Sequence, residues 1–150
     1  LTNICRDVYE DALNGRVYLP GDLFESITAE KIVSPDVSTT ESVRQVVGYL
    51  LSEAEIRYES GISGLCFLPT QARLAIYVAA LTYREIGLII ADRRFDIWAG
   101  RAFTTKTQKC LIAIRCVVTF LFSKKAHQYQ GFHDAELHRG LNHRPGVHWA

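Results

Sequence analysis

The sequence predicts an all-α fold, and three observations support this prediction. Apolar residues recur three and four positions apart along several long segments. The period-two alternation that is typical of half-buried strands is nearly absent. Glycine, proline and asparagine separate the periodic segments at positions where helices begin and end. Hydrophobic residues make up 48% of the 150 residues, so the chain can bury a sizeable core.

The first part of the chain contains two expected helices. Residues 1–13 have helical periodicity, and Asn14 followed by Gly15 is a typical carboxyl-terminal cap. Residues 16–24 are expected to form an extended loop. Residues 29–33 predict a short second helix, which a proline-containing break then ends.

A third helix is expected after this break. Ser38 or Thr39 is expected to cap it, and its periodicity extends to about Ser60. The residues on its apolar side are Val43, Val46, Val47, Leu50, Leu51, Ala54 and Ile56. This side should face the core.

Two further helices complete the expected fold. Residues 71–94 predict a long helix that is apolar nearly all round between residues 74 and 81, so we expect it to be central. Thr104 or Thr105 should begin the last helix. We therefore expect residues 1–125 to belong to a single domain and residues 126–150, which are polar, to form a flexible tail.

Composition excludes several classes of protein. The 17 basic and 16 acidic residues give a net charge of +1, which argues against a nucleic-acid-binding protein. The apolar stretch at residues 74–91 is interrupted by Arg84 and Glu85, so we do not expect a transmembrane span. The four cysteines form no CxxC pair, and we interpret them as reduced thiols of a cytoplasmic protein. The chain contains no methionine and begins within a helix pattern, so we expect it to be truncated at its amino terminus.

The first helix carries the strongest candidate for a chemical site. Asn3, Asp7 and Asp11 are four residues apart, which places them in one column with neighbouring Cβ atoms roughly 5–6 Å apart. Magnesium is typically bound by one or two carboxylates together with substrate phosphate oxygens. Arg6 is free either to pair with Glu10 or to contact a phosphate. A solvated acidic helix face has the same spacing, so the spacing alone leaves both interpretations open.

Two other clusters of polar residues are less informative. Asp92 and Asp96 have the same spacing, but they lie at an expected helix end beside two arginines, and we interpret them as a surface salt-bridge cluster. All five histidines lie in the tail, at His127, His133, His138, His143 and His148. The last four are five residues apart, a spacing that scatters them around a helix, so we do not expect a zinc site there.

Residues 1–12, together with the loop from Gly15 to Pro20, resemble the second aspartate-rich motif of the squalene and phytoene synthase family. Later segments resemble the family in the same order. The matching stretches are 53–55, 61–69, 83–87, 100–102, 104–106 and Lys109. The resemblance covers residues 1–122 and the later half of the family's fold, and it is closer to bacterial phytoene synthases than to squalene synthases.

The resemblance implies a partial isoprenoid synthase fold, a helical bundle around a central cavity. It further implies head-to-head condensation of two geranylgeranyl diphosphates to phytoene through a cyclopropyl diphosphate intermediate, in carotenoid biosynthesis. By position, Asn3, Asp7 and Asp11 would be metal-binding residues for Mg²⁺ or Mn²⁺, and Asp7, Asp11 and Tyr83 would be catalytic. The residues that would contact the substrate diphosphate are Asn3, Arg6, Tyr83 and Arg101.

The resemblance leaves two alternatives open. One is a squalene or dehydrosqualene synthase that uses farnesyl diphosphate; the other is a non-catalytic helical protein that binds partners. We favour the phytoene type, which needs no NADPH because the last cation is quenched by proton loss. The partners are then isoprenoid diphosphates and not nucleic acid, and an apolar product is compatible with peripheral membrane association. The family's first aspartate-rich motif is not in this chain, so we expect these 150 residues alone to be inactive.

Overall fold

The structure is a computed structural model that describes residues 1–21 and 27–122. Over these two ranges it contains five α-helices, one 3₁₀-helix and no strand, which confirms the predicted all-α class. In chain order the elements are α1 (Thr2–Leu13), α2 (Ala29–Val33), α3 (Val37–Ser63), η1 (Gly64–Phe67), α4 (Thr70–Asp92) and α5 (Lys106–Phe122). The expected boundary at residues 125 and 126, and the five histidines of the tail, lie outside the described residues.

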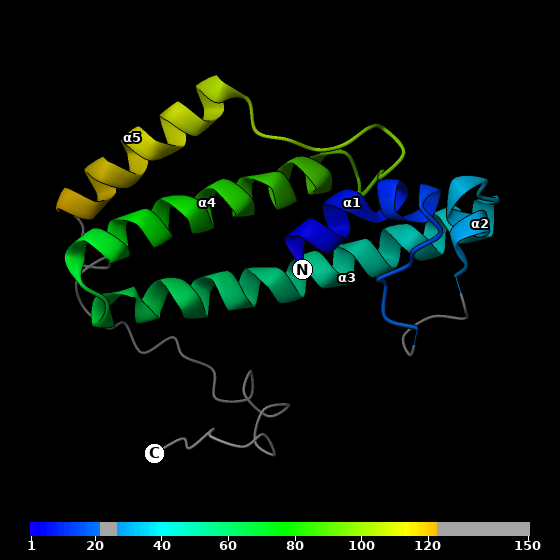
Figure 1. Cartoon of the computed structure of the whole chain (residues 1–150), viewed down its shortest axis with the longest axis horizontal. Coiled ribbons are helices and arrows are strands. Elements are labelled where there is room, and N and C mark those ends of the chain that lie inside the picture. Colours follow the sequence, from blue (N-terminus) through cyan, green and yellow to red (C-terminus); the bar gives the residue numbers. More distant parts are fainter. Residues whose placement is uncertain (22–26, 123–150) are drawn as a thin grey trace, which may run out of the picture.

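Helices α3 and α4 form a long antiparallel hairpin, with η1 at its turn (Figure 1). The side chain of Arg73 stabilises this turn, because its Nη2 atom donates to the carbonyl oxygens of Cys66 and Leu68, at 3.0 and 2.8 Å. Helices α1 and α2 lie at the opposite end of the hairpin, and α5 lies along α4 (Figure 1). A loop that leaves the end of α4 passes α1 before α5 begins, and this arrangement positions the candidate site (Figure 1).

The helix caps agree only in part with the sequence prediction. Helix α3 begins at Val37 and is capped by Asp36, whose Oδ1 atom accepts the Thr39 N–H at 2.6 Å, so the prediction of Ser38 or Thr39 was wrong. A carboxylate is a stronger acceptor than a hydroxyl for the free N–H groups at a helix start. Thr105, one of the two residues predicted, caps α5, because its Oγ1 atom accepts the Gln108 N–H at 3.2 Å.

The core lies where α1, α2 and α3 meet the end of α4 and the loop that follows it. Its largest fully buried side chains are Cys5, Ile32, Val43, Val46 and Val47. Burial raises the pKa of the Cys5 thiol to about 11, which keeps it protonated, as expected for a packing residue. The predicted apolar side of α3 is largely confirmed, although Ile56 is exposed. The indole N–H of Trp98 donates to the Ile32 carbonyl at 2.9 Å and ties the loop to α2.

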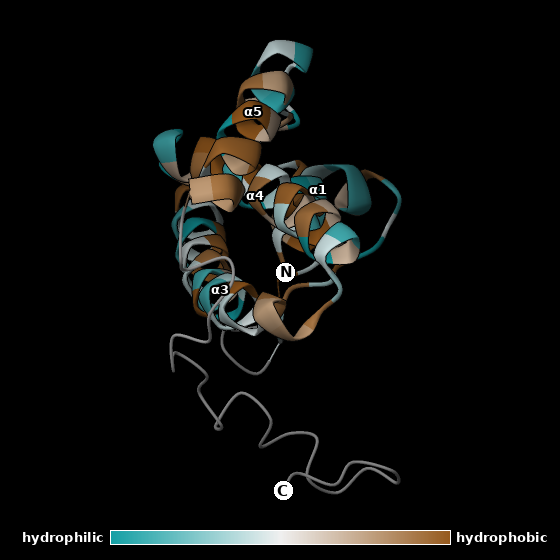
Figure 2. Ribbon diagram, turned by 90° about the vertical axis from the view of Figure 1, so that its left-hand side faces the viewer, coloured by the Kyte–Doolittle hydropathy of each residue, from teal (hydrophilic) through white to brown (hydrophobic). Residues whose placement is uncertain are grey.

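The prediction that the long apolar helix is central was wrong for its first half. Only Ile86 and Ile90 of α4 are buried, and both lie towards its end. The helix lies next to α1, α3 and α5 (Figure 2). These neighbours leave Ile76 and Leu88 exposed. By length and composition alone, α4 also meets the criterion for a membrane span, a criterion that core helices of soluble proteins meet as well. That α4 does not span a membrane therefore stays a prediction.

The segment after α4 differs from the predicted salt-bridge cluster. Asp96 pairs with Arg44 of α3, with 3.6 Å between Nη2 and Oδ2, and not with either of the neighbouring arginines. Its Oδ1 atom accepts the backbone N–H groups of Trp98 and Ala99, at 3.0 and 3.2 Å. The aspartate therefore holds the turn that leads into the loop before α5.

Candidate functional site

Helix α1 presents one buried and one polar face. Thr2, Cys5, Val8 and Ala12 are buried against the core, which turns the polar residues of α1 away from it. Arg6 and Asp7 are half-buried at the edge of this interface, whereas Asn3 is exposed. Packing of the buried face thus positions the helix against the core.

Two arginines hold the carboxylate of Asp7. Arg6 binds it in a bidentate manner, with 2.8 Å from Nε to Oδ1 and 2.6 Å from Nη2 to Oδ2. Arg101 lies in the loop before α5 and donates from Nε to Oδ1 at 2.9 Å. The hydrogen bonds from Arg6, and after them the one from Arg101, hold the pKa of the Asp7 carboxyl below its usual range. Residues 94 positions apart in the sequence therefore meet at one carboxylate.

Local backbone geometry brings Arg101 to this place. Gly100 has φ of 89°, a conformation that residues with a Cβ atom rarely adopt. Its carbonyl accepts a hydrogen bond from Arg93 Nη1 at 2.9 Å, and Ala102 on the other side is buried in the core. Arg101 is thus fixed at both flanks while its own side chain stays 54% exposed.

A cavity of about 360 Å³ lies beside this arginine pair. Its lining comes from α1, α4, the loop before α5 and α5 itself: Arg6, Thr82, Tyr83, Ile86, Arg101, Ala102, Phe103, Thr104 and Lys109. The charged residues of this lining are three cations, and it includes no Asp or Glu. Ile86, Ala102 and Phe103 add apolar surface next to the cations. Such a cavity suits an anion that is attached to an apolar group.

The structure brings together some of the residues predicted from the sequence and separates others. Arg6, Tyr83 and Arg101 line this cavity, and Asp7 is bonded to two of them. Asn3 and Asp11 are not among the lining residues. Asp11 lies one turn further along α1, beside Val17, Tyr18 and Leu19 of the following loop.

The sequence prediction did not include three polar residues of this lining, Thr82, Thr104 and Lys109. Lys109 and Thr104 belong to the segment whose resemblance to the family was noted, but no role was assigned to them. The helix prediction contained a usable signal, because Lys109 lies in the first turns of α5 and therefore near the loop that carries Arg101. No sequence pattern indicated that Thr82 belongs to the lining. In the structure its hydroxyl donates to the Val78 carbonyl at 2.8 Å.

By chemical type alone, the donor set of α1 suits a divalent cation of the magnesium type. Asp7 and Asp11 offer carboxylate oxygens four residues apart, and Asn3 offers an amide oxygen one turn earlier. These are hard oxygen ligands and too few for an all-protein cage, which is the usual situation where substrate phosphates complete the coordination of Mg²⁺. Within residues 1–21 and 27–122 no group of three or more His, Cys, Asp and Glu residues is placed to hold a metal.

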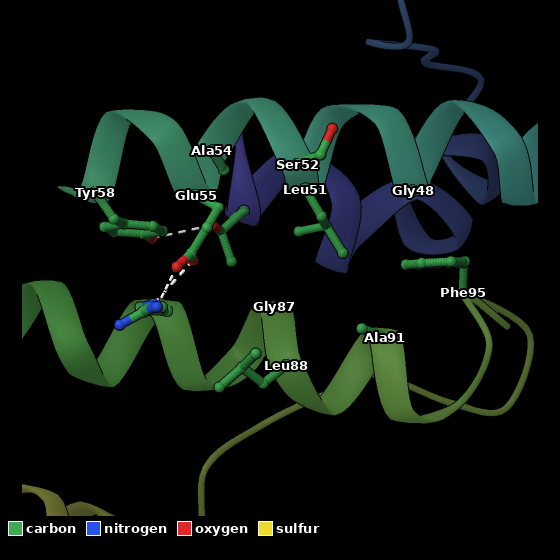
Figure 3. Close-up of a pocket in the computed structure, with 12 residues that line it drawn as sticks. Gly48, Leu51, Ser52, Ala54, Glu55, Tyr58, Gly87, Leu88, Ala91 and Phe95 are labelled. Atoms are coloured by element: carbon green, nitrogen blue, oxygen red, sulfur yellow. Dashed lines mark hydrogen bonds and ion pairs between the residues drawn. The ribbon is translucent and has the colours of Figure 1, made fainter. Parts of the chain in front are cut away.

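A second hollow lies between α3 and α4 and has a volume of about 250 Å³ (Figure 3). Its wall contains small residues from both helices, including Gly48, Ala54, Gly87 and Ala91 (Figure 3). Glu55 closes one end by an ion pair with Arg84, with 2.8 Å from Nε to Oε2. This hollow is mostly apolar and contains none of the residues predicted for the site.

Comparison with known proteins identifies the family of this chain. The family model for squalene/phytoene synthase matches residues 1–108. A phytoene synthase of Cereibacter sphaeroides is 40% identical over 111 residues, which cover 73% of this chain and 31% of the relative. A 15-cis-phytoene synthase of Pantoea ananas is 32% identical over 130 residues, which cover 85% of this chain and 41% of the relative.

A phytoene synthase of Rhodobacter capsulatus is 36% identical over 111 residues, or 73% of this chain and 32% of the relative. The chain thus spans about a third to two fifths of the length of these relatives. No solved structure matches it. The family match covers more than two thirds of the chain and includes α1, α4 and the loop with Arg101. The chain belongs to the squalene/phytoene synthase family.

Proposed function

We propose that the protein carrying this chain condenses two geranylgeranyl diphosphates to phytoene, and that the cation-lined cavity binds a substrate diphosphate. The observation that carries this proposal is the lining itself, in which three cations meet apolar side chains beside an aspartate helix. A prenyl diphosphate combines a highly charged head with an apolar chain, so it needs both kinds of surface at once. The names of the relatives, phytoene synthase and 15-cis-phytoene synthase, support the choice of product.

The proposed reaction begins when the bond between the allylic carbon and the diphosphate breaks, and the diphosphate leaves with the bonding electrons. The double bond of the second substrate attacks the allylic cation, and loss of a proton closes a cyclopropyl ring. This intermediate loses its own diphosphate and rearranges, and a second proton loss gives phytoene. The steps that need help from the protein are the two ionisations, because each releases a highly charged leaving group.

The residues of the cavity are suited to support these ionisations. Arg6, Arg101 and Lys109 would neutralise the charge that grows on the leaving diphosphate. Tyr83 of α4 would donate its phenolic O–H to a diphosphate oxygen. Ile86 and Phe103 would hold the first part of the prenyl chain and keep water from the cation. No covalent nucleophile is required.

A divalent cation, Mg²⁺ or Mn²⁺, is part of the proposal. Asp7 and Asp11 would hold it from α1, with Asn3 supporting either the ion or the diphosphate. When bound, the ion would supply charge stabilisation for the diphosphate. We propose that no nicotinamide cofactor is needed, since both cations of the phytoene reaction end in proton loss. We also propose a cytoplasmic location, with peripheral membrane contact for the apolar product.

A product assay on the full-length protein tests this proposal. Purified protein is incubated with geranylgeranyl or farnesyl diphosphate, with and without NADPH, and with magnesium or with EDTA. We expect phytoene from the C20 substrate in magnesium, independent of NADPH, and no hydrocarbon in EDTA. A C30 product that forms only with NADPH would replace the phytoene assignment by the squalene type. Absence of any hydrocarbon under all conditions would favour the non-catalytic alternative.

A further inference from the structure

The side chain of Thr104 contains a buried hydroxyl that has no hydrogen-bond partner within residues 1–21 and 27–122. The residue is 5% exposed, and its Oγ1 atom is shielded from solvent without a hydrogen bond to any described residue. Two other buried hydroxyl groups among the described residues are paired. Thr2 Oγ1 lies 3.0 Å from the hydroxyl oxygen of Tyr58, and Ser63 donates to the Ser60 carbonyl at 2.8 Å. Because buried polar groups nearly always have a partner, an unpaired hydroxyl needs an explanation.

The position of Thr104 in the fold explains its unpaired hydroxyl. The residue lines the cavity that also contains Arg6, Arg101 and Lys109, so the missing partner would be an acceptor among cations. Lysine and arginine side chains are donors only and cannot accept the hydroxyl proton. An anion in the cavity would provide the oxygen acceptor that the protein lacks there.

The backbone at Thr104 is held firmly on both sides. Ala102 is buried, and Thr105 forms a reciprocal capping box with Gln108 at the start of α5. The Thr105 N–H donates to Gln108 Oε1 at 2.8 Å, and the Gln108 N–H donates to Thr105 Oγ1 at 3.2 Å. The side chain of Thr104 can therefore respond to a ligand only by rotation about χ1. This rotation exchanges the hydroxyl and the methyl group and needs no movement of the backbone.

We propose that Thr104 is a diphosphate-positioning residue, whose hydroxyl turns towards the cavity and donates a hydrogen bond to an oxygen of the bound diphosphate. The inference rests on the proposed function, because it uses the same anion. It adds a neutral, directional donor to the three cations of the lining. The lysine ammonium attracts a diphosphate from many directions, whereas a hydroxyl of fixed origin, like the planar arginine groups, favours one orientation of it.

The test replaces Thr104 by valine, which keeps the branched shape and removes the hydroxyl, and by serine, which keeps the hydroxyl. Binding of inorganic pyrophosphate to the full-length protein is measured by calorimetry, with magnesium and in EDTA. We expect the valine variant to bind about tenfold more weakly in both solutions, as is typical when a hydrogen bond to a charged group is lost. The serine variant should bind within about twofold of the parent, since it retains the donor.

Thermal unfolding separates positioning from a structural role. Without pyrophosphate, the valine variant should unfold at the same temperature as the parent or higher, because an unpaired buried hydroxyl is replaced by a methyl group. With pyrophosphate, its rise in unfolding temperature should be smaller than that of the parent. A valine variant that loses stability without pyrophosphate, and that binds it as well as the parent does, would overturn the inference.

Failure of the inference can be told from failure of the proposed function. A parent protein that binds no pyrophosphate in either solution would overturn both. If the parent binds pyrophosphate and the valine variant binds it equally well, only the role of Thr104 is overturned. If the serine variant binds as weakly as the valine variant, the methyl group and not the hydroxyl is responsible, and the role of Thr104 as a donor is again overturned.

Discussion

Replacing Asp7 by asparagine should destabilise the protein, whereas replacing Asp11 in the same way should not. The sequence alone predicts no loss for either variant, because each removes a like-charge repulsion between residues four apart on a helix. The structure changes this expectation for Asp7. Its carboxylate is the shared partner of Arg6 and Arg101, and the asparagine side chain would leave two guanidinium groups side by side without a counter-charge.

The size of the effect follows from the exposure of each pair. Arg6 and Asp7 are 17% and 23% exposed and form two hydrogen bonds, so their pairing is worth about 1–2 kcal/mol, above the value for exposed pairs. Arg101 is 54% exposed, and its bond to Asp7 adds about 0.5 kcal/mol or less. Relief of the repulsion with Asp11 returns about 0.2–0.5 kcal/mol. Asp7→Asn should thus cost about 1–2 kcal/mol, and Asp11→Asn should be neutral or stabilise the protein by a few tenths of a kcal/mol.

The free energies of unfolding of the purified parent and both variants are measured by urea denaturation. Unfolding is followed by circular dichroism at neutral pH without added magnesium. The Asp11→Asn variant is the matched control, since it makes the same chemical change one turn further along α1. Both variants should lose most of the activity of the full-length protein if the two carboxylates hold the metal. Equal free energies of unfolding would refute the argued role of Asp7 in pairing the arginines. Near-normal activity in both variants would refute metal binding by this helix.

The remaining predictions concern the loop and the cavity. Gly100→Ala should cost about 1 kcal/mol in thermal or urea unfolding because of the positive φ, whereas Gly61→Ala in α3, with free space around it, should stabilise by up to about 1 kcal/mol. Arg101→Ala should lower kcat/KM by about tenfold or more and Tyr83→Phe by less, because a cationic donor to phosphate is stronger than a neutral one. Equal and negligible effects on kcat/KM would show that neither residue contacts the diphosphate. The 150-residue chain by itself should give no hydrocarbon from geranylgeranyl diphosphate and magnesium, and detectable turnover would contradict this.

Local sequence patterns were sufficient to predict the five α-helices of the described residues but not the 3₁₀-helix η1. Helical periodicity and the Asn14–Gly15 cap placed α1, and the apolar residues from Val43 to Ala54 identified the buried side of α3. The helix α4 was predicted correctly, but the prediction that it is central was wrong for its first half, because an apolar composition does not report how many neighbours cover a helix. Its first half is apolar but has too few contacts within the described residues to be buried.

Residue spacing alone predicts a candidate site only where its residues share one helix. The spacing of Asn3, Asp7 and Asp11 follows directly from helix geometry. The bonds from Arg6 and Arg101 to Asp7 do not, because a contact across 94 residues depends on how the loop after α4 turns back to α1. The resemblance to the family named Arg101, but no sequence pattern indicated that its partner in this structure is an aspartate. The cavity lining, and the unpaired hydroxyl of Thr104 within it, likewise depend on tertiary packing.

The pairing of Asp7 with two arginines links the two halves of the proposed site. In the structure, Arg6 and Arg101 are both bonded to Asp7, and both also line the cavity. A diphosphate in that cavity would compete with Asp7 for the same two guanidinium groups, because it offers more charge and more oxygen acceptors. Any oxygen of Asp7 released in this exchange becomes a free ligand for a cation that also binds the diphosphate. Diphosphate binding and metal binding should therefore favour each other. In the absence of ligand, Asp7 and the two arginines satisfy one another's charge.

On this argument Arg101→Ala acts in two ways, since it weakens the attraction for diphosphate and also removes one hydrogen bond to Asp7. The Arg101→Ala variant should be less active than the parent. Its activity should also depend less on the order in which magnesium and substrate are added.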